Sequence, residues 1–106
     1  MNTPKFLAKT SVVVQIFDGF DENGSPVVGK EVPVKARTES SNAIVYGSDG
    51  QKRTLNLKAF IFEGFDDFYV SMTGRVLVGA EEHDIAQVKQ LLNPNGSINH
   101  YVLGLI

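Results

Sequence analysis

Apolar and polar residues alternate along three stretches of this chain, and this period of two is its most constraining feature. Residues 10–18, 31–39 and 53–62 each place a set of apolar residues on one side of an extended strand. The inward sets are Val12, Val14 and Ile16, then Val32, Val34 and Ala36, then Leu55, Leu57, Ala59 and Ile61. Such alternation is typical of antiparallel strands that cover a core with one face. The sequence therefore predicts an all-β protein.

Turn-forming segments divide the remaining chain. Residues 21–26 combine Asn-Gly, which tolerates positive φ, with a proline that fixes φ, so they are expected to reverse the chain. Two further strands are predicted at 74–78 and 98–105, the second after a turn at 93–97. Pro33 cannot donate a ladder hydrogen bond, so its strand is expected to lie at an edge or to carry a bulge there.

A length of 106 residues is near the commonest size of one domain. We interpret 1–106 as a single domain, with residues 1–8 as a flexible N-terminal arm. The N-terminus has no apolar segment of the length found in signal peptides, and apolar runs elsewhere span only a few residues. We therefore expect neither a secretion signal nor a membrane span.

Residues 38–51 are predicted to form a long internal loop. Ser, Asn and Gly at both ends enclose a short apolar island with room for a small strand. Residues 81–92 are harder to interpret, because they alternate poorly and instead repeat Ile85, Val88 and Leu91 at helical spacing. Since Asn-Pro follows, periodicity favours one short helix within 80–92.

No constellation of catalytic or metal-binding residues is recognisable. The chain has no cysteine, and its two histidines, His83 and His100, are too few for a closed metal site. The acidic turn at 18–23 lacks the ligand spacing of a calcium loop, and no P-loop, G-x-G-x-x-G or G-x-S-x-G motif is present. We expect a protein that is not an enzyme, holds no cofactor or metal, and acts by binding other proteins.

Several large apolar residues fall outside the inward sets. Phe17, Phe60 and Phe62 lie on the opposite faces of their strands, and the same is predicted for three residues of the last strand, namely Tyr101, Leu103 and Leu105. Two explanations stay open. Either loops or a helix cover these faces, or the apolar surface is buried only in an assembly.

The order of five features resembles that of a known protein family. They are the opening strand 10–17, the turn with Gly24 and Pro26, the stretch Val32–Arg37, the glycine-led strand 74–78 followed by 83–88, and the ending Asn95-Gly96-Ser97 with His100-Tyr101. Together they resemble the short head-closure or minor capsid proteins of long-tailed bacteriophages and prophages. These proteins lie in the neck between the portal and the tail.

The resemblance implies a small antiparallel β-barrel or sandwich whose long internal loop faces the channel, with part of 81–92 as a strand instead of a helix. It also implies a structural virion protein, a ring-forming head–tail connector that closes the DNA-filled head and provides the platform for the tail. Its partners would be the portal or adaptor ring, tail proteins and further copies of itself, whereas DNA would only pass through the channel. It would act in the virion neck, after assembly in the host cytoplasm, and be monomeric in isolation.

Two alternatives to head closure stay open. One is another ring protein of the neck or tail end, either an adaptor or a tail terminator. The other is a β-barrel that binds a nucleic acid or a small ligand, as OB-folds do. A nucleic-acid binder would need a basic stripe with stacking aromatics, whereas residues 59–106 carry two Lys or Arg against six acids.

A ring repeats one heterologous contact, so each subunit needs two complementary surfaces. The basic surface is expected to comprise Lys30, Lys35, Arg37, Lys52 and Arg53, and the acidic one Asp66, Asp67, Glu81, Glu82 and Asp84. The residues expected to contact partner proteins are Ile44, Val45, Tyr46, Phe60, Phe62, Asp66 and Asp67. Charge would orient the contact, and apolar residues would supply most of its strength.

The composition of 38–51 leads to a first prediction. Limited proteolysis of the isolated protein should cleave this segment before any other, because a loop rich in Ser, Asn and Gly opens readily. Mass spectrometry of the first fragments gives the site. Ile44, Val45 and Tyr46 should gain amide-exchange protection only on assembly. Strong protection of these three residues in the isolated protein would contradict the prediction.

Overall fold

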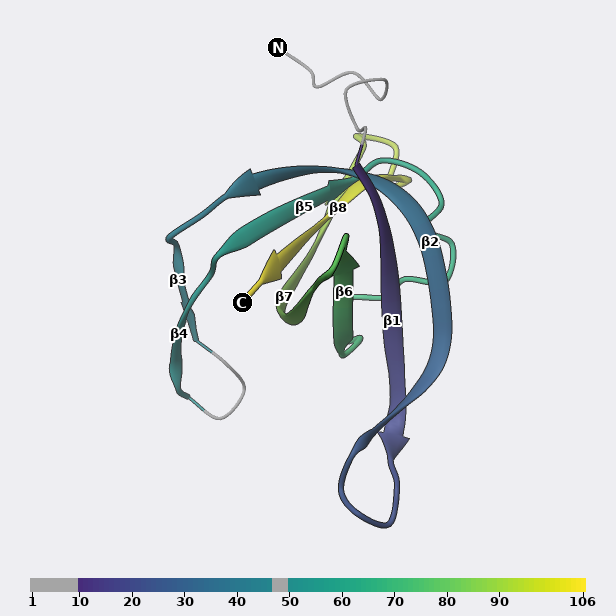
Figure 1. Cartoon of the computed structure of the whole chain (residues 1–106). Coiled ribbons are helices and arrows are strands. Elements are labelled where there is room, and N and C mark those ends of the chain that lie inside the picture. Colours follow the sequence, from purple (N-terminus) through teal and green to yellow (C-terminus); the bar gives the residue numbers. More distant parts are fainter. Residues whose placement is uncertain (1–9, 47–49) are drawn as a thin grey trace.

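The computed structural model describes residues 10–46 and 50–106, and no helix occurs among them (Figure 1). Six strands close into an antiparallel barrel in the order β1–β2–β5–β8–β7–β6, and β3 and β4 form a separate two-stranded sheet. The strands are β1 (Thr10–Phe20), β2 (Pro26–Ser40), β3 (Ile44–Tyr46), β4 (Lys52–Thr54), β5 (Leu57–Ile61), β6 (Gly74–Val78), β7 (Glu81–Leu92) and β8 (Ile98–Leu105). The predicted small antiparallel barrel is confirmed. Residues 1–8, expected to form a flexible arm, lie outside the described residues.

The core consists largely of the side chains that alternation placed inward. All ten are buried except Leu57, which is partly buried and packs against the others. Side chains from β1, β2, β5, β6 and β8 meet in the centre of the barrel, where Val14, Ala59 and Val76 have no exposed surface. The three stretches of alternating residues, 10–18, 31–39 and 53–62, therefore turn their predicted faces to the core.

The prediction for the last strand is wrong, because Tyr101, Leu103 and Leu105 belong to the core. Tyr101 is 1% exposed, and the two leucines are fully buried. The pairing of β8 with β5 places Tyr101 opposite Ile61 and Leu103 opposite Ala59. Residues directly opposite each other share a face of the sheet, so the inward face of β5 fixes that of β8.

The helix that periodicity favoured within 80–92 does not form, and the strand that the resemblance implies for part of 81–92 is confirmed. This segment is β7, which pairs with β6 over 81–84 and with β8 over 85–92. A register shift lies between Ile85 and Gln87, and one extra residue in a strand interrupts the alternation of its side chains. Ile85 and Val88, three residues apart, therefore both pack against the core. The bulge, and not a helix, produced the apparent helical spacing.

The predicted strand over 53–62 is divided in two. After Ser40 the chain leaves the barrel, forms the β3–β4 hairpin and returns at Leu55, whose backbone N–H donates to the carbonyl of Ala43 at 2.8 Å. Asn56 then donates to the carbonyl of Leu105 at 2.7 Å, which attaches the chain to the barrel again. A small strand does lie inside the long loop, at Ile44–Tyr46. Residues 47–49 of that loop lie outside the described residues, and the mobility of the loop stays a prediction.

The first half of β2 lies at an edge, as the position of Pro33 predicts. Pro33 is opposite Val13 of β1, and the pairing of β2 with β5 begins only at Arg37. The pairing of β1 with β6 ends at Ile16 and Gly74. From there to the turn, β1 and β2 pair only with each other. Residues 17–28, here called the hairpin arm, project beyond the barrel (Figure 1).

The connection between β5 and β6, residues 62–73, is held to the barrel by Tyr101. Its ring lies 5.3 Å from that of Phe65 and 5.4 Å from that of Phe68, measured between centroids. The Tyr101 hydroxyl donates to the backbone carbonyl of Phe68 at 3.1 Å and accepts from Nε2 of Gln90 at 2.9 Å. One side chain thus ties the connection to two strands of the barrel.

These contacts predict the effect of Tyr101→Phe. The substitution keeps the ring but removes the donor to the Phe68 carbonyl, so the free energy of unfolding should fall by about 1–3 kcal/mol. Urea denaturation measures the change. Tyr46→Phe is the matched control, because Tyr46 is 72% exposed, and its effect should stay within about 0.5 kcal/mol. Equal losses in the two variants would contradict this account of Tyr101.

Candidate protein-interaction surfaces

A group of flat side chains lies on the outer face of β2, β5 and β8. The guanidinium carbon of Arg37 lies 4.8 Å from the ring centroid of Phe60. The His100 ring lies 4.9 Å from that of Phe62 and 6.4 Å from that of Phe60. We call these four residues the aromatic face. The strand registers bring these four side chains together. Arg37 is opposite Phe60, and Ile61 is opposite Tyr101 in the last pair of β5 and β8. Phe62 follows Ile61 and His100 precedes Tyr101, so these two residues also lie near each other.

The two phenylalanines of the aromatic face are partly buried, and not fully exposed. Neither a loop nor a helix was needed to cover them, because a guanidinium group and an imidazole ring lie against the rings. Phe17 has a similar partner, since the guanidinium carbon of Arg75 lies 5.1 Å from its ring centroid. Aromatic and Arg side chains are enriched in protein interfaces, and the aromatic face suits such a contact.

The β3–β4 hairpin presents a second apolar surface. Ile44 is 52% exposed and Tyr46 is 72% exposed, whereas Val45 between them is partly buried. Tyr46 lines a groove with other parts of the chain, and no residue of the aromatic face lines that groove. The described structure thus places the predicted contact residues of β3 and those of β5 on different surfaces.

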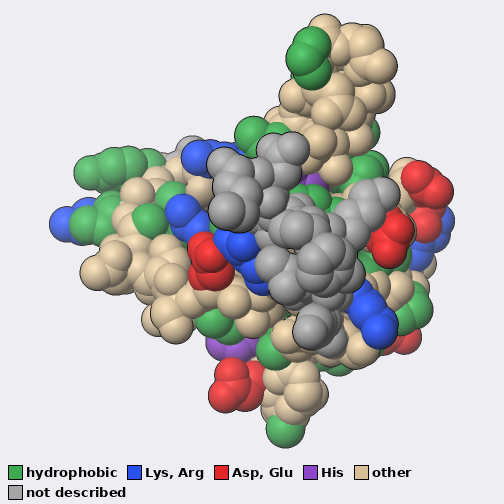
Figure 2. Space-filling model, turned by 90° about the horizontal axis from the view of Figure 1, so that it is seen from above, with side chains coloured by type: hydrophobic (Ala, Val, Ile, Leu, Met, Phe, Trp, Pro, Cys, Tyr) green, Lys and Arg blue, Asp and Glu red, His purple; other side chains and the backbone are tan. Residues whose placement is uncertain are grey.

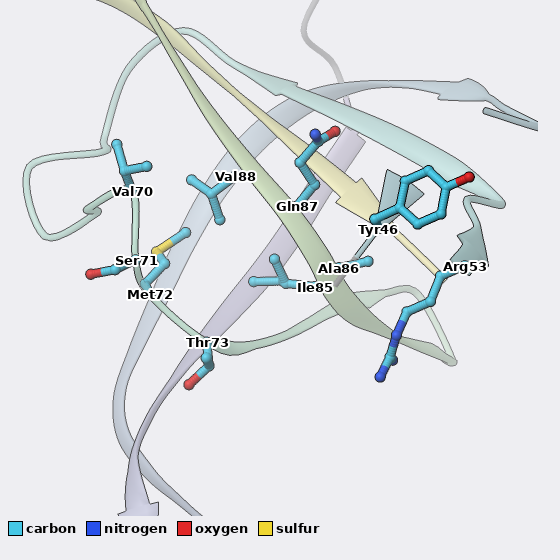
Figure 3. Close-up of a pocket in the computed structure, with 10 residues that line it drawn as sticks. All are labelled: Tyr46, Arg53, Val70, Ser71, Met72, Thr73, Ile85, Ala86, Gln87 and Val88. Carbon is cyan, nitrogen blue, oxygen red and sulfur yellow. The ribbon is translucent and has the colours of Figure 1, made fainter. Parts of the chain in front are cut away.

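The groove lies between the β3–β4 hairpin, residues 70–73 and β7, and has a volume of about 530 Å³. Figure 3 shows β7 in the middle, with Val70 and Met72 on one side and Tyr46 and Arg53 on the other. We call it the β7 groove, and its lining is completed by Ser71, Thr73, Ile85, Ala86, Gln87 and Val88. In the described chain, residues 85–92 pair only with β8, so the other edge of this strand has no strand partner.

The two predicted charge sets meet within one subunit. Asp66 and Asp67 are exposed in the β5–β6 connection, and Asp67 Oδ1 lies 2.9 Å from Nζ of Lys30. Glu82 of the acidic set pairs at 3.1 Å with Arg75 of β6, which belongs to neither set. Basic and acidic side chains are interspersed over the described part of the face in Figure 2. The uneven charge along the sequence therefore does not separate into two distant faces at these points.

Several exposed apolar residues were not predicted from the sequence. Phe20 at the tip of the hairpin arm is 73% exposed, and Val70 at the rim of the β7 groove is 55% exposed. Leu92, beside the β7–β8 turn, is 56% exposed. Their positions next to turns indicated exposure only weakly. Near a turn, alternation does not show which face of the strand another segment covers.

Over 10–46 and 50–106, no three or more His, Cys, Asp or Glu side chains gather as a metal site requires. No helix long and apolar enough to cross a membrane occurs in the described part of the chain.

The position of His100 leads to a pH-dependent prediction. Burial lowers the pKa of His100 below its usual 6.5, so the folded state favours the neutral imidazole. Below about pH 6.5 the unfolded chain binds this proton more readily than the folded one, and the free energy of unfolding should fall. Urea denaturation at pH 7.5 and pH 5.5 measures the change. Between these two pH values, the free energy of unfolding should fall less for His100→Gln than for the unaltered protein.

His83→Gln is the control for this comparison. Its free energy of unfolding should fall between pH 7.5 and pH 5.5 as much as that of the unaltered protein, because His100 is retained. The assignment fails if the stability of His100→Gln depends on pH as strongly as that of the unaltered protein.

No family model matches the chain, and no curated protein matches it. What bears on function is therefore the closed barrel, its two projecting hairpins, the aromatic face and the β7 groove.

Proposed function

We propose that this chain is a ring-forming structural protein of the bacteriophage neck, a head–tail connector that closes the DNA-filled head and provides the platform for the tail. One observation carries the proposal: two hairpins project from a small closed barrel, and both carry exposed apolar side chains. Phe20 on the hairpin arm and Tyr46 on the β3–β4 hairpin are each more than two-thirds exposed, at 73% and 72%. Apolar groups exposed in this way are typical of surfaces that become buried in an assembly.

The arrangement of these surfaces suits a ring. A ring subunit needs two different surfaces, because its contact with the next copy is heterologous. The hairpin arm leaves the barrel from β1 and β2, whereas the β3–β4 hairpin leaves it between β2 and β5. The subunit thus has projecting elements on different sides, which neighbours on both sides can contact (Figure 1).

The β3–β4 hairpin is the element that we assign to the channel. It is the long internal loop of the sequence, and the resemblance to head-closure proteins implies that this loop faces the channel. Lys52 and Arg53 lie on it and are exposed. Of these two, Lys52 would meet the phosphates of the DNA that passes through, while Ile44 would contact other copies of the hairpin.

A second candidate function is binding of a single-stranded nucleic acid. The observation in its favour is the aromatic face, which Lys58 and Lys89 extend. Lys58 lies on the same side of β5 as Phe60, and Lys89 is opposite Val102, which is itself opposite Phe60. Aromatic rings among basic side chains are the usual platform for stacked bases. Against it, both rings are already covered in part by Arg37 and His100.

Deleting the gene from the phage or prophage that encodes it tests the connector proposal. We expect heads that carry no tails. They should package DNA and then lose it, because nothing closes the portal. Electron microscopy and the amount of DNase-resistant DNA measure the two effects. Supplying the unaltered protein in trans should restore tailed particles. Normal tailed and infectious particles from the deletion strain would refute the proposal.

The second candidate is tested on the purified protein. A connector should leave the fluorescence anisotropy of a labelled single-stranded oligonucleotide unchanged at micromolar protein and low salt. Binding that disappears in Phe62→Ala but not in Ile44→Ala would favour the nucleic-acid function instead. Ile44 is the matched control, because it is apolar and exposed but lies outside the aromatic face.

A further inference from the structure

The hairpin arm carries an apolar anchor on a well-ordered turn. Phe20 is 73% exposed, and two valines beside it, Val27 and Val28, are 40% and 38% exposed. The carboxylate of Asp21 accepts from the backbone N–H groups of Asn23 and Ser25, both at 2.9 Å. These bonds hold the turn in one conformation, so little ordering is needed when Phe20 meets a partner.

The arm is also acidic. Residues 17–28 contain Asp18, Asp21 and Glu22 and no Lys or Arg. All three acids are exposed. A partner that accepts Phe20 therefore needs exposed apolar side chains with a basic group beside them.

The β7 groove has these properties. Tyr46 and Val70 expose 72% and 55% of their surface at its rim, while Met72 is almost completely buried within it. Among the described residues that line the groove, Arg53 is the charged one. The groove thus has apolar side chains at its rim, polar ones such as Ser71, Thr73 and Gln87 in its lining, and one basic side chain, Arg53, on the side of the β3–β4 hairpin.

We propose that the hairpin arm of one copy docks into the β7 groove of the next copy. Phe20 enters the hollow over β7, between Val70 and Tyr46, and the acids of the arm face Arg53. The inference rests on the proposed ring and names its repeating contact. Because the arm and the groove are different surfaces, the contact is heterologous and repeats from copy to copy.

The size of the contact determines when it forms. An aromatic side chain buries about 150–250 Å², and two half-exposed valines add little, whereas a stable interface buries about 800 Å² on each partner. Free subunits should therefore associate only weakly. Copies held side by side on a portal or adaptor ring reach a high effective concentration, and there the same contact completes the ring.

Cysteine cross-linking tests the proposal, because the chain has no cysteine of its own. Phe20→Cys and Val70→Cys are purified separately, mixed at about 1 mM and oxidised mildly. The mixed disulfide should form in at least several-fold greater yield than when Phe20→Cys is mixed with Leu92→Cys. Leu92 is the matched control, because it is as exposed as Val70, at 56% against 55%, and does not line the groove.

A charge exchange tests the orientation of the contact. Glu22→Lys in the Phe20→Cys protein should lower the yield of the mixed disulfide several-fold. Arg53→Glu in the Val70→Cys protein should restore much of it. Val27→Cys provides a second position on the arm, so the test does not depend on one variant. Circular dichroism confirms that each variant is folded.

Three outcomes would overturn the proposal. They are equal yields with Val70→Cys and Leu92→Cys, preferred cross-linking to Leu91→Cys beside the aromatic face, and preferred pairing of two Phe20→Cys copies. The test uses only purified protein, so it is separate from the deletion experiment. A specific cross-link together with normal particles would refute the connector function alone. Untailed heads without the specific cross-link would refute the docking contact alone.

Discussion

The barrel depends on one buried hydroxyl group. Tyr101 is the largest of the fully buried side chains, and a buried hydroxyl without partners is costly. Its two hydrogen bonds, to the carbonyl of Phe68 and from Gln90, require that the β5–β6 connection and β7 both be in place. The same two segments form the floor and one side of the β7 groove. The stability of the core and the shape of the proposed docking site therefore depend on the same contact.

Clean alternation made the first strands predictable, since β1 and the second half of β2 each have one apolar face and one more polar face. The last strand was different, because Val102 lies between Tyr101 and Leu103, and apolar residues on both faces do not show which face turns inward. Only the register with β5 decides it. In β7 the extra residue at Ala86 interrupts the period, and a single-residue bulge has no reliable sequence signal.

The candidate surfaces were predictable only in part. The outward positions of Phe60 and Phe62 followed from alternation, but their partners Arg37 and His100 come from other strands and required the register. Lys30 and Asp67 are 37 residues apart in the chain, so no local pattern indicated that they pair.

The barrel contains two corners, and they have a mechanical consequence. β2 pairs with β1 up to Ala36 and with β5 from Arg37, while β7 pairs with β6 up to Asp84 and with β8 from Ile85. These two strands thus connect one layer, which carries the hairpin arm, to another, from which the β3–β4 hairpin extends. Bending at the corners would change the angle between arm and groove without breaking a strand pair. In a closed ring that angle sets the diameter, so flexing of two strands would let one subunit fit rings of different width.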